Sequence, residues 1–523
     1  MLNLVSTFEH SAKEFPNKKA IIFQDQSFTF SQIQAMVNRV ANALRRKGIG
    51  KGDKVALSCM NLPYFPMVYY GILKTGAVVV PLNILLKGRE IAYHLKDSEA
   101  TFHICFEGTP ELPMAKHGFA GFNKVDSCKE FIVITMDPAA PSPIDGTMTL
   151  EQLIAEENEI SDTESTSPDD TAVILYTSGT TGFPKGAELS HSNMTMNALG
   201  SRHLFQLVHD DVHALVLPLF HSFGQTCQMN AGFSIGNTLV MIPKFMPEAV
   251  LSAVENNGAS IFVGVPTMYW ALLNFEDKKN QFNHEKIIKT LRLGVCGASS
   301  LAIEIIKGIE EKYKLPIIEG YGLSETCPVA TFLHVNKERK PGSVGTPIWG
   351  VEVEIFDKKN NALPPGEIGE VVIRGHNVMK GYYNKPDATA KAFDGTTWFH
   401  SGDLGKKDED GYFYIVDRVK DMIIRGGYNV YPREIEEVLL THPDVSLASV
   451  LGVKHERNGE EIVAYIIPAE GSSITESEII EWSKEEMAAF KYPRIVRIVK
   501  SLPMTATGKI LKKDLRAEME AQG

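Results

Sequence analysis

The sequence has few of the features that mark a secreted, membrane-embedded or nucleic-acid-binding protein. Its 523 residues contain six cysteines and no CxxC pair, which indicates free thiols in a reducing compartment and excludes a zinc site built on paired cysteines. The most apolar stretch, residues 67–86, is interrupted by Lys74 and Pro81, so no membrane-spanning helix is predicted. The formal net charge of -11 argues against binding to nucleic acid. We therefore expect a cytoplasmic protein with at most peripheral membrane contact.

Strand-like and helix-like patterns alternate through most of the chain. Apolar runs bounded by turn residues predict the strands, and helical periodicity between them predicts the helices. The strands are expected at residues 54–59, 77–80, 101–106, 171–175, 215–219, 261–265 and 291–295, with helices at 65–73 and 89–95. Ser31 and Gln34 form a candidate capping box for a further helix that ends near Gly48. The alternation predicts an α/β fold layered around parallel strands.

Changes of composition divide the chain. Residues 151–170 contain eight acidic and no basic residues, which predicts a solvated connector. Beyond residue 340 the segments become short and β-rich, and a final α+β unit begins near Lys420. Because a chain of this length cannot fold around one core, several units are expected. We predict a large domain of stacked α/β subdomains plus a small β subdomain, residues 1–419, followed by a small mobile domain, residues 420–523.

A loop rich in glycine and hydroxyl residues follows the strand predicted at 171–175. It runs from Tyr176 to Gly186 and contains one lysine, Lys185. Free backbone N–H groups, hydroxyls and an ammonium together suit a polyphosphate. It is not a Walker A loop, because Pro184 precedes the lysine and glycine stands where Ser or Thr would bind magnesium. A solvated surface loop is the alternative, but the length of the run and its single lysine favour phosphate binding.

Four further motifs follow this loop along the chain. They are Glu-Gly-Tyr-Gly-Leu-Ser-Glu-Thr at 319–326, Trp-Phe-His-Ser-Gly-Asp at 398–403, a charged and glycine-containing stretch at 417–428, and Pro-Met-Thr-Ala-Thr-Gly-Lys-Ile at 503–510. Together with the loop, they resemble the adenylate-forming superfamily of acyl-CoA synthetases, luciferases and peptide-synthetase adenylation domains. The resemblance is closest to bacterial fatty-acid:CoA ligases. It implies a hinge at Lys420 between the two domains.

The resemblance also implies a reaction and a set of residues for it. A carboxylic acid would react with ATP to give an acyl-adenylate and pyrophosphate, and CoA would then displace AMP. The catalytic residues would be Lys509, Lys185, Glu325 and His221, and Glu325 with Thr177 would hold Mg²⁺. The ATP and AMP site would comprise Thr177, Ser178, Gly179, Thr180, Thr181, Gly182, Lys185, Gly297, Ala298, Ser299, Gly320, Tyr321, Gly322, Thr326, Asp403, Arg418 and Lys509. Taken singly, each of these residues would pass for an ordinary surface or core group, and a packed structural role suits His221 about as well.

The resemblance places the acyl pocket at His221, Phe223, Gly224, Gln225 and Met268. The lining segments contain no lysine or arginine that could hold a second carboxylate, so a hydrophobic tail is the simplest ligand. Gly426 and Gly427 would let the pantetheine arm of CoA pass. A ligase for an aromatic or other small acid, an enzyme that loads a carrier protein, and a binding protein without catalysis remain the alternatives. The sequence leaves the oligomeric state open, a homodimer included.

Overall fold

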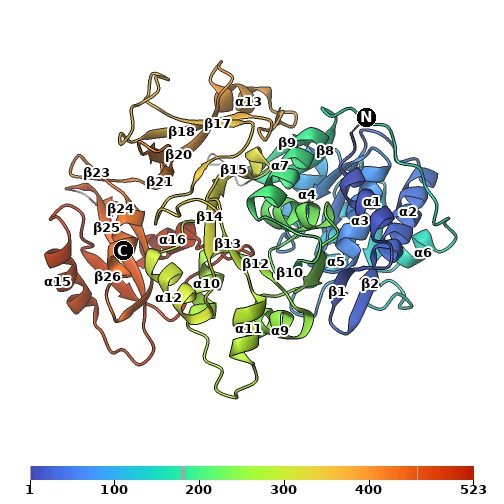
Figure 1. The fold of residues 1–523 in the computed structure, drawn as a ribbon. Helices are drawn as coiled ribbons and strands as arrows, with labels where there is room; N and C mark the ends of the chain where they lie inside the picture. The colour runs from blue at the N-terminus through green and yellow to red at the C-terminus, as the bar shows by residue number, and fades with distance from the viewer. Residues whose placement is uncertain (1, 178–182, 456, 523) are drawn as a thin grey trace.

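The computed structural model describes residues 2–177, 183–455 and 457–522, and shows a large N-terminal region followed by a small C-terminal domain (Figure 1). This confirms the predicted α/β class and its division into a large and a small domain. None of the described helices is both long and apolar enough to span a bilayer. All six cysteines are buried and free.

Two large sheets form the core of the N-terminal region. The first has the order β19-β9-β8-β4-β3-β5-β6-β7, and its strands are Gly381–Tyr382, Lys185–Ser190, Thr171–Thr177, Val78–Pro81, Lys54–Ser58, Phe102–Phe106, Glu130–Ile134 and Met148–Thr149. The second has the order β16-β15-β14-β13-β12-β10-β11-β1-β2, with strands Thr346–Pro347, Val329–Phe332, Ile317–Gly322, Leu293–Cys296, Ile261–Gly264, Val212–Leu215, Thr238–Met241, Lys19–Phe23 and Gln26–Thr29. Within each sheet the central strands are parallel, as the alternating pattern predicted.

Helices cover both sheets and follow the strands along the chain. They are α1 (Val5–Glu14), α2 (Phe30–Arg46), α3 (Tyr64–Lys74), α4 (Gly88–Asp97), α5 (Met114–Phe122), α6 (Leu150–Ile154), α7 (His191–Leu204), α8 (Ala231–Phe233), α9 (Pro247–Asn257), α10 (Pro266–Leu273), α11 (His284–Thr290) and α12 (Ile303–Tyr313). A π-helix, η1 (Phe223–Asn230), precedes α8, and a 3-10 turn, η2 (Ser324–Thr326), follows β14. The capping box of α2 is formed by Thr29 and Gln32, so the predicted box at Ser31 and Gln34 is wrong by two residues.

The small β subdomain and the C-terminal domain complete the fold. The subdomain contains β17 (Val351–Phe356), β18 (Gly369–Gly375), β20 (Phe399–Lys407) and β21 (Phe413–Arg418), with α13 (Pro386–Phe393) at its side. The C-terminal domain contains β22 (Ile423–Arg425), β23 (Tyr428–Val430), β24 (Val445–His455), β25 (Gly459–Pro468), β26 (Ile495–Ile498), α14 (Pro432–Leu439), α15 (Glu476–Glu486) and α16 (Lys512–Gln522). Figure 1 shows this domain, coloured orange to red, beside α10 and α12.

The acidic connector is fastened to the N-terminal helices. Its side chains are mostly exposed, as predicted, but residues 150–154 form α6 and the backbone of residues 158–162 runs along α2. Three side chains of α2, Asn38, Asn42 and Arg45, donate hydrogen bonds to carbonyl oxygens of this backbone at 2.6–3.0 Å. The side-chain amides and guanidinium of one helix therefore supply hydrogen-bond donors to the backbone carbonyls of a segment that has no secondary structure of its own.

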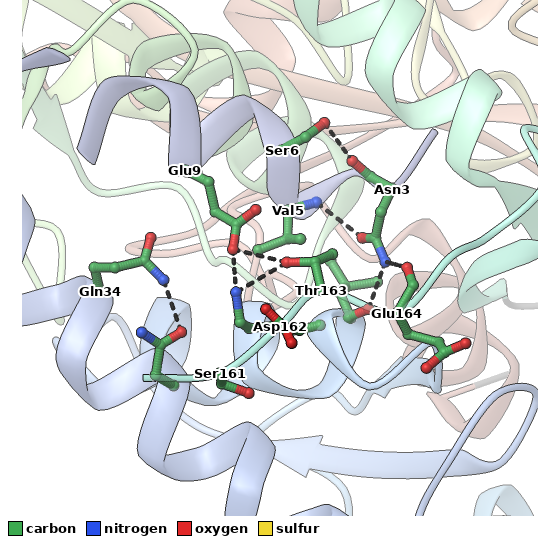
Figure 2. Close-up of polar contacts among 12 residues, drawn as sticks. Asn3, Val5, Ser6, Glu9, Gln34, Ser161, Asp162, Thr163 and Glu164 are labelled. Atoms are coloured by element: carbon green, nitrogen blue, oxygen red, sulfur yellow. Dashed lines mark hydrogen bonds and ion pairs between the residues drawn. The ribbon is translucent and has the colours of Figure 1, made fainter. Parts of the chain in front are cut away.

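A buried ion pair lies beneath this segment. The Lys74 side chain at the end of α3 is 3% exposed and pairs with Glu9 of α1, which is 17% exposed. Thr163 donates to Glu9 at 2.8 Å, and Figure 2 shows these two side chains pointing toward each other. Lys74 donates in turn to the Thr163 hydroxyl at 2.9 Å. The pair therefore joins α1, α3 and the connector.

We predict that Glu9→Ala destabilises the protein, because it leaves the Lys74 ammonium buried without a counter-ion. The expected loss is about 3 kcal/mol in the free energy of unfolding of the N-terminal region. The matched control is Glu14→Ala on the same helix, whose carboxylate pairs with His10 in solvent and whose loss should cost less than about 1 kcal/mol. Denaturant unfolding followed by circular dichroism measures both, and equal losses would contradict the prediction.

Candidate active site

The hairpin β8–β9 carries the predicted phosphate loop. Thr177 at the end of β8 lies opposite Lys185 at the start of β9 in the antiparallel register. Five residues of the predicted site, Ser178, Gly179, Thr180, Thr181 and Gly182, lie outside the described residues. The returning chain is fixed by Tyr93 of α4, which donates to the Pro184 carbonyl at 2.7 Å and stacks on Phe183 at 5.1 Å. The structure thus confirms that a buried strand delivers the loop.

The Glu325 carboxylate lies at the mouth of this hairpin. One of its oxygens, Oε1, accepts hydrogen bonds from Thr177 Oγ1 at 3.1 Å and from the Tyr382 hydroxyl at 2.9 Å. The Lys185 ammonium lies over the Tyr382 ring, 4.3 Å from its centroid. Tyr382, on β19, was not among the predicted site residues. Residues from β8, β9, η2 and β19 therefore meet around one carboxylate.

The donor set around Glu325 fits a magnesium ion that is shared with a bound phosphate. No group of three or more His, Cys, Asp or Glu side chains in the described ranges could hold a metal alone. Mg²⁺ is commonly held by one or two carboxylates together with water and substrate phosphates. Glu325 with the neighbouring Thr177 hydroxyl supplies oxygen donors of that kind.

A second carboxylate lies between β14 and β21. Asp403, which is 5% exposed, accepts from the Tyr321 hydroxyl at 2.7 Å and pairs with Arg418 at 3.2 Å. The two residues of the ion pair face each other in the register of β20 and β21. Burial, with Asp403 beside it, raises the pKa of Tyr321 well above its usual value, so the phenol stays protonated. The structure therefore brings Tyr321, Asp403 and Arg418 together.

Several of the predicted nucleotide residues shape the protein itself. A side chain at Gly320 would collide with the Phe332 ring, and one at Gly322 would collide with the Pro328 carbonyl, so both glycines permit close packing of β14 on β15. Thr326 is fully buried and its hydroxyl hydrogen bonds within the η2 turn. Gly297, Ala298 and Ser299 follow β13. Ala298 has a φ of 70°, a strained conformation for a non-glycine residue.

The region bounded by Glu325, Asp403, Arg418 and His221 is here called the crevice, and Lys509 of the C-terminal domain lies beside it. Loss of hydration and the nearby Arg418 guanidinium lower the pKa of Lys509 to about 8, against the opposing effects of Asp403 and Asp421. Burial together with the positive charge of Lys509 lowers the pKa of His221 to about 4, so this imidazole is neutral near pH 7. The lysine therefore lies close enough to both the Asp403–Arg418 pair and His221 to interact electrostatically with each.

The residues predicted for the acyl pocket fall into two groups. Phe223 and Met268 are each 6% exposed, and the Phe223 ring packs against Gly297. Gln225 lies in the core, where its amide accepts from Tyr69 at 3.2 Å and donates to a carbonyl oxygen at 3.1 Å. Gly224 packs tightly on the carbonyl groups of the preceding turn. Phe223 and Met268 are thus buried apolar side chains, whereas Gln225 is hydrogen-bonded within the protein core.

Two predicted glycines lie in the turn between β22 and β23. Gly426 and Gly427 have φ values of 58° and 84°, and no atom lies within 4 Å of the position that a side chain would occupy at either. Lys420 lies in the connection between β21 and β22. Its charge contributes to the lowered pKa of Lys509, so the connection lies near the crevice.

The two buried carboxylates Glu325 and Asp403, with a lysine that comes from a separate domain, are the arrangement expected of an adenylate-forming enzyme. A family model described as "AMP-binding enzyme" matches residues 8–383, and one described as "AMP-binding enzyme C-terminal domain" matches residues 434–509. The chain belongs to the AMP-binding enzyme family, and within it the chain is an AMP-forming acid-thiol ligase that uses ATP and CoA.

Named relatives cover nearly the whole chain. A long-chain-fatty-acid–CoA ligase of Bacillus subtilis is 32% identical over 98% of this chain and 94% of its own length. A feruloyl-CoA synthase of Amycolatopsis is 35% identical over 97% of this chain and 96% of its own. The solved structure of the anthranilate CoA ligase AuaEII with anthranoyl-AMP has a TM-score of 0.89, at 28% identity, over 100% of this chain and 98% of its own. The acids named for these relatives differ from one another.

We predict that Tyr382→Phe weakens ATP binding about tenfold, because Glu325 loses a hydrogen bond to its charged group while the ring beneath Lys185 remains. Calorimetric titration with ATP in the presence of Mg²⁺ measures the change. The adjacent Tyr383→Phe is the matched control, since that hydroxyl donates to the exposed Glu99 instead. Equal affinity of the two variants would show that Tyr382 does not position Glu325.

Proposed function

We propose that the protein is a fatty-acid:CoA ligase for medium- or long-chain acids. The observation that supports this is the uncharged lining predicted for the acyl pocket. Phe223, Val265 and Met268 are buried, and residues 221–232, 265–270, 295–298 and 329–332 contain no Lys, Arg, Asp or Glu. A second carboxylate or a cationic group on the acid would be buried there without a counter-ion, at a high cost in free energy. A hydrocarbon chain needs no such partner.

In the first step, a carboxylate oxygen of the acid attacks the α-phosphorus of ATP, and the bond to the β-phosphate oxygen breaks to release pyrophosphate. We assign the charge compensation at the α-phosphate and the carboxylate to the Lys509 ammonium. The loop from Thr177 to Lys185 would hold the β- and γ-phosphates. Glu325 with Thr177 would hold Mg²⁺, which neutralises phosphate charge when bound.

The remaining contacts orient the nucleotide. Asp403, held by Tyr321 and Arg418, would accept hydrogen bonds from the ribose hydroxyls, because a buried carboxylate has acceptor capacity beyond these two partners. The Tyr321 ring would stack on adenine beside residues 297–299. The neutral His221 would lie near the acid's carboxylate without adding a second positive charge to that of Lys509.

In the second step, the sulfur of CoA attacks the acyl carbonyl and AMP leaves as the C–O bond breaks. We assign the hinge for this step to Lys420, between residues 1–419 and 420–523, so that rotation removes Lys509 and brings another face of the small domain to the crevice. The open space at Gly426 and Gly427 suits the narrow pantetheine arm.

An aromatic acid with a polar substituent is the second candidate substrate. Three polar atoms in or beside η1 are buried without a partner among the described residues, namely Ser222 Oγ, Gln228 Oε1 and Asn230 Nδ2. Buried polar groups of this kind are normally hydrogen-bonded, and a substrate hydroxyl, which both donates and accepts, would supply a partner. The similarity to a feruloyl-CoA synthase favours the same class.

The substrate proposal is tested by measuring AMP and pyrophosphate release with ATP, Mg²⁺ and CoA across a panel of acids. The dependence of kcat/KM on chain length, from acetate to palmitate, reports the depth of the pocket. Benzoate, coumarate and ferulate test the aromatic candidate. We expect the highest kcat/KM with a fatty acid of medium or greater length. A preference for an aromatic acid, or for acetate, would overturn the proposal and leave the ligase activity itself intact.

We predict a pH dependence from the lowered pKa of Lys509. The protonated lysine compensates charge, so kcat/KM for adenylation should be constant below about pH 7 and fall about tenfold per unit above pH 8. Lys509→Arg should keep a charge at high pH and remove this fall.

Lys509→Ala should slow adenylation at least about 100-fold and spare thioester formation from presynthesised acyl-AMP. Equal loss in both half-reactions would contradict the assigned role.

A further inference from the structure

Helix α10 lies between the predicted acyl pocket and the C-terminal domain. Its N-terminal end carries Val265 and Met268, whose side chains are 2% and 6% exposed. Two other residues of the same short helix, Thr267 and Trp270, contact the small domain. Helix α10 therefore contacts both the predicted acyl pocket and the C-terminal domain that carries Lys509.

Thr267 contacts the turn that carries Lys509. Its hydroxyl donates a hydrogen bond to the Gly508 carbonyl at 2.8 Å, across 241 positions of sequence. Gly508 has a φ of 78°, and a side chain there would lie 2.9 Å from Val265 and 3.0 Å from the Thr267 hydroxyl. The turn therefore seats directly on α10, in a conformation and at a distance that glycine alone tolerates.

The lysine turn is internally rigid. Gly508 N–H donates to the Thr505 carbonyl at 2.9 Å, Thr505 N–H donates to the Lys509 carbonyl at 2.8 Å, and the Thr505 hydroxyl accepts from the Lys509 N–H at 3.0 Å. Because these bonds fix Lys509 relative to Gly508, a contact that holds Gly508 also holds the backbone from which the ammonium extends.

Trp270 makes the second contact, one turn further along α10. Its indole Nε1 donates to the Ser446 hydroxyl at 2.8 Å, at the start of β24. Its ring packs against the core of the N-terminal region and also against the apolar cluster of the small domain that contains Leu447 and Leu502. The two contacts of α10 therefore reach separate parts of the small domain.

We propose that Thr267 and Trp270 are positioning residues that hold the small domain in the orientation in which Lys509 faces the acid and ATP. The proposal rests on the role assigned to Lys509 above, and it does not depend on which acid the enzyme prefers. Both contacts join the two domains, so rotation of the small domain about Lys420 would break both. They stabilise the orientation for the first step and contribute nothing to the second.

The test compares the two half-reactions in four single variants of the full chain and in the double variant Trp270→Phe/Ser446→Ala. Thr267→Val removes the hydroxyl at nearly constant volume, Trp270→Phe removes the indole N–H, and Ser446→Ala removes its acceptor. Thr290→Val is the matched control, because that hydroxyl also donates to a backbone carbonyl, at 2.8 Å, but within the exposed helix α11. Adenylation is followed by pyrophosphate exchange with any acid that the wild-type enzyme accepts, and thioester formation is followed from presynthesised acyl-AMP.

We expect Thr267→Val and Trp270→Phe each to lower kcat of adenylation about 3- to 10-fold. The reason is that each variant loses one hydrogen bond that stabilises the orientation of the small domain required for the first step. The KM for the acid and the rate of thioester formation should stay near those of the wild type. Ser446→Ala should add nothing to Trp270→Phe, because both remove the same bond. Thr290→Val should change neither rate.

Unchanged adenylation in Thr267→Val and Trp270→Phe would overturn the proposal. So would an equal fall in both half-reactions, which would indicate general loss of structure. Failure of the wild-type enzyme to form an acyl-adenylate with any acid would instead refute the proposed function, and the two failures are thereby distinguished.

Discussion

The arrangement of the whole molecule depends on holding one ammonium group in a poorly hydrated crevice. Lys509 comes from the last tenth of the chain, yet its pKa responds to Arg418 and Asp403 of the small β subdomain, and it lowers the pKa of His221 beside η1. Burying a charge costs free energy unless partners compensate for it. The small domain seats closely against the start of α10, and the glycine at 508 allows that seating, because a side chain there would meet Val265 and Thr267.

The other end of the crevice is organised by the Glu325 carboxylate. Glu325 gathers Thr177 and Tyr382, and Lys185 packs on the face of the tyrosine ring. Because Tyr382 lies on β19, which pairs with β9, the segment after residue 380 completes the sheet that delivers the phosphate loop. The small β subdomain thus contributes to both ends of the crevice, through Asp403 and Arg418 at one and through its connection to Tyr382 at the other.

Local patterns predicted much of the fold, and long-range contacts account for what they missed. Strands such as β3 and β12 were found within one residue, because their apolar runs are bounded by turn residues. The strand expected at 215–219 lies instead at Val212–Leu215, since His213 is buried in the sheet and does not mark its edge. The sequence motifs predicted Asp403, Arg418 and Lys509 as site residues, and the structure brings the three close together. No local signal marks Tyr382 or Thr267, whose partners lie 57 and 241 residues away.

The lowered pKa of Lys509 also bears on how the two steps follow each other. The pKa of Lys509 is lower when the small domain holds it in the crevice than when it is in solvent. Placing it in the crevice therefore favours release of its proton, and protonation by itself favours the orientation in which the lysine lies outside the crevice. In the role proposed for it, the lysine acts in its protonated form, and the phosphates and carboxylate of the substrates would supply the negative charge that stabilises it in the crevice. Once pyrophosphate has left and the acid is held as the acyl-phosphate mixed anhydride, much of that charge is gone. The desolvation that lowers the pKa of Lys509 would then favour its departure from the crevice before the second step.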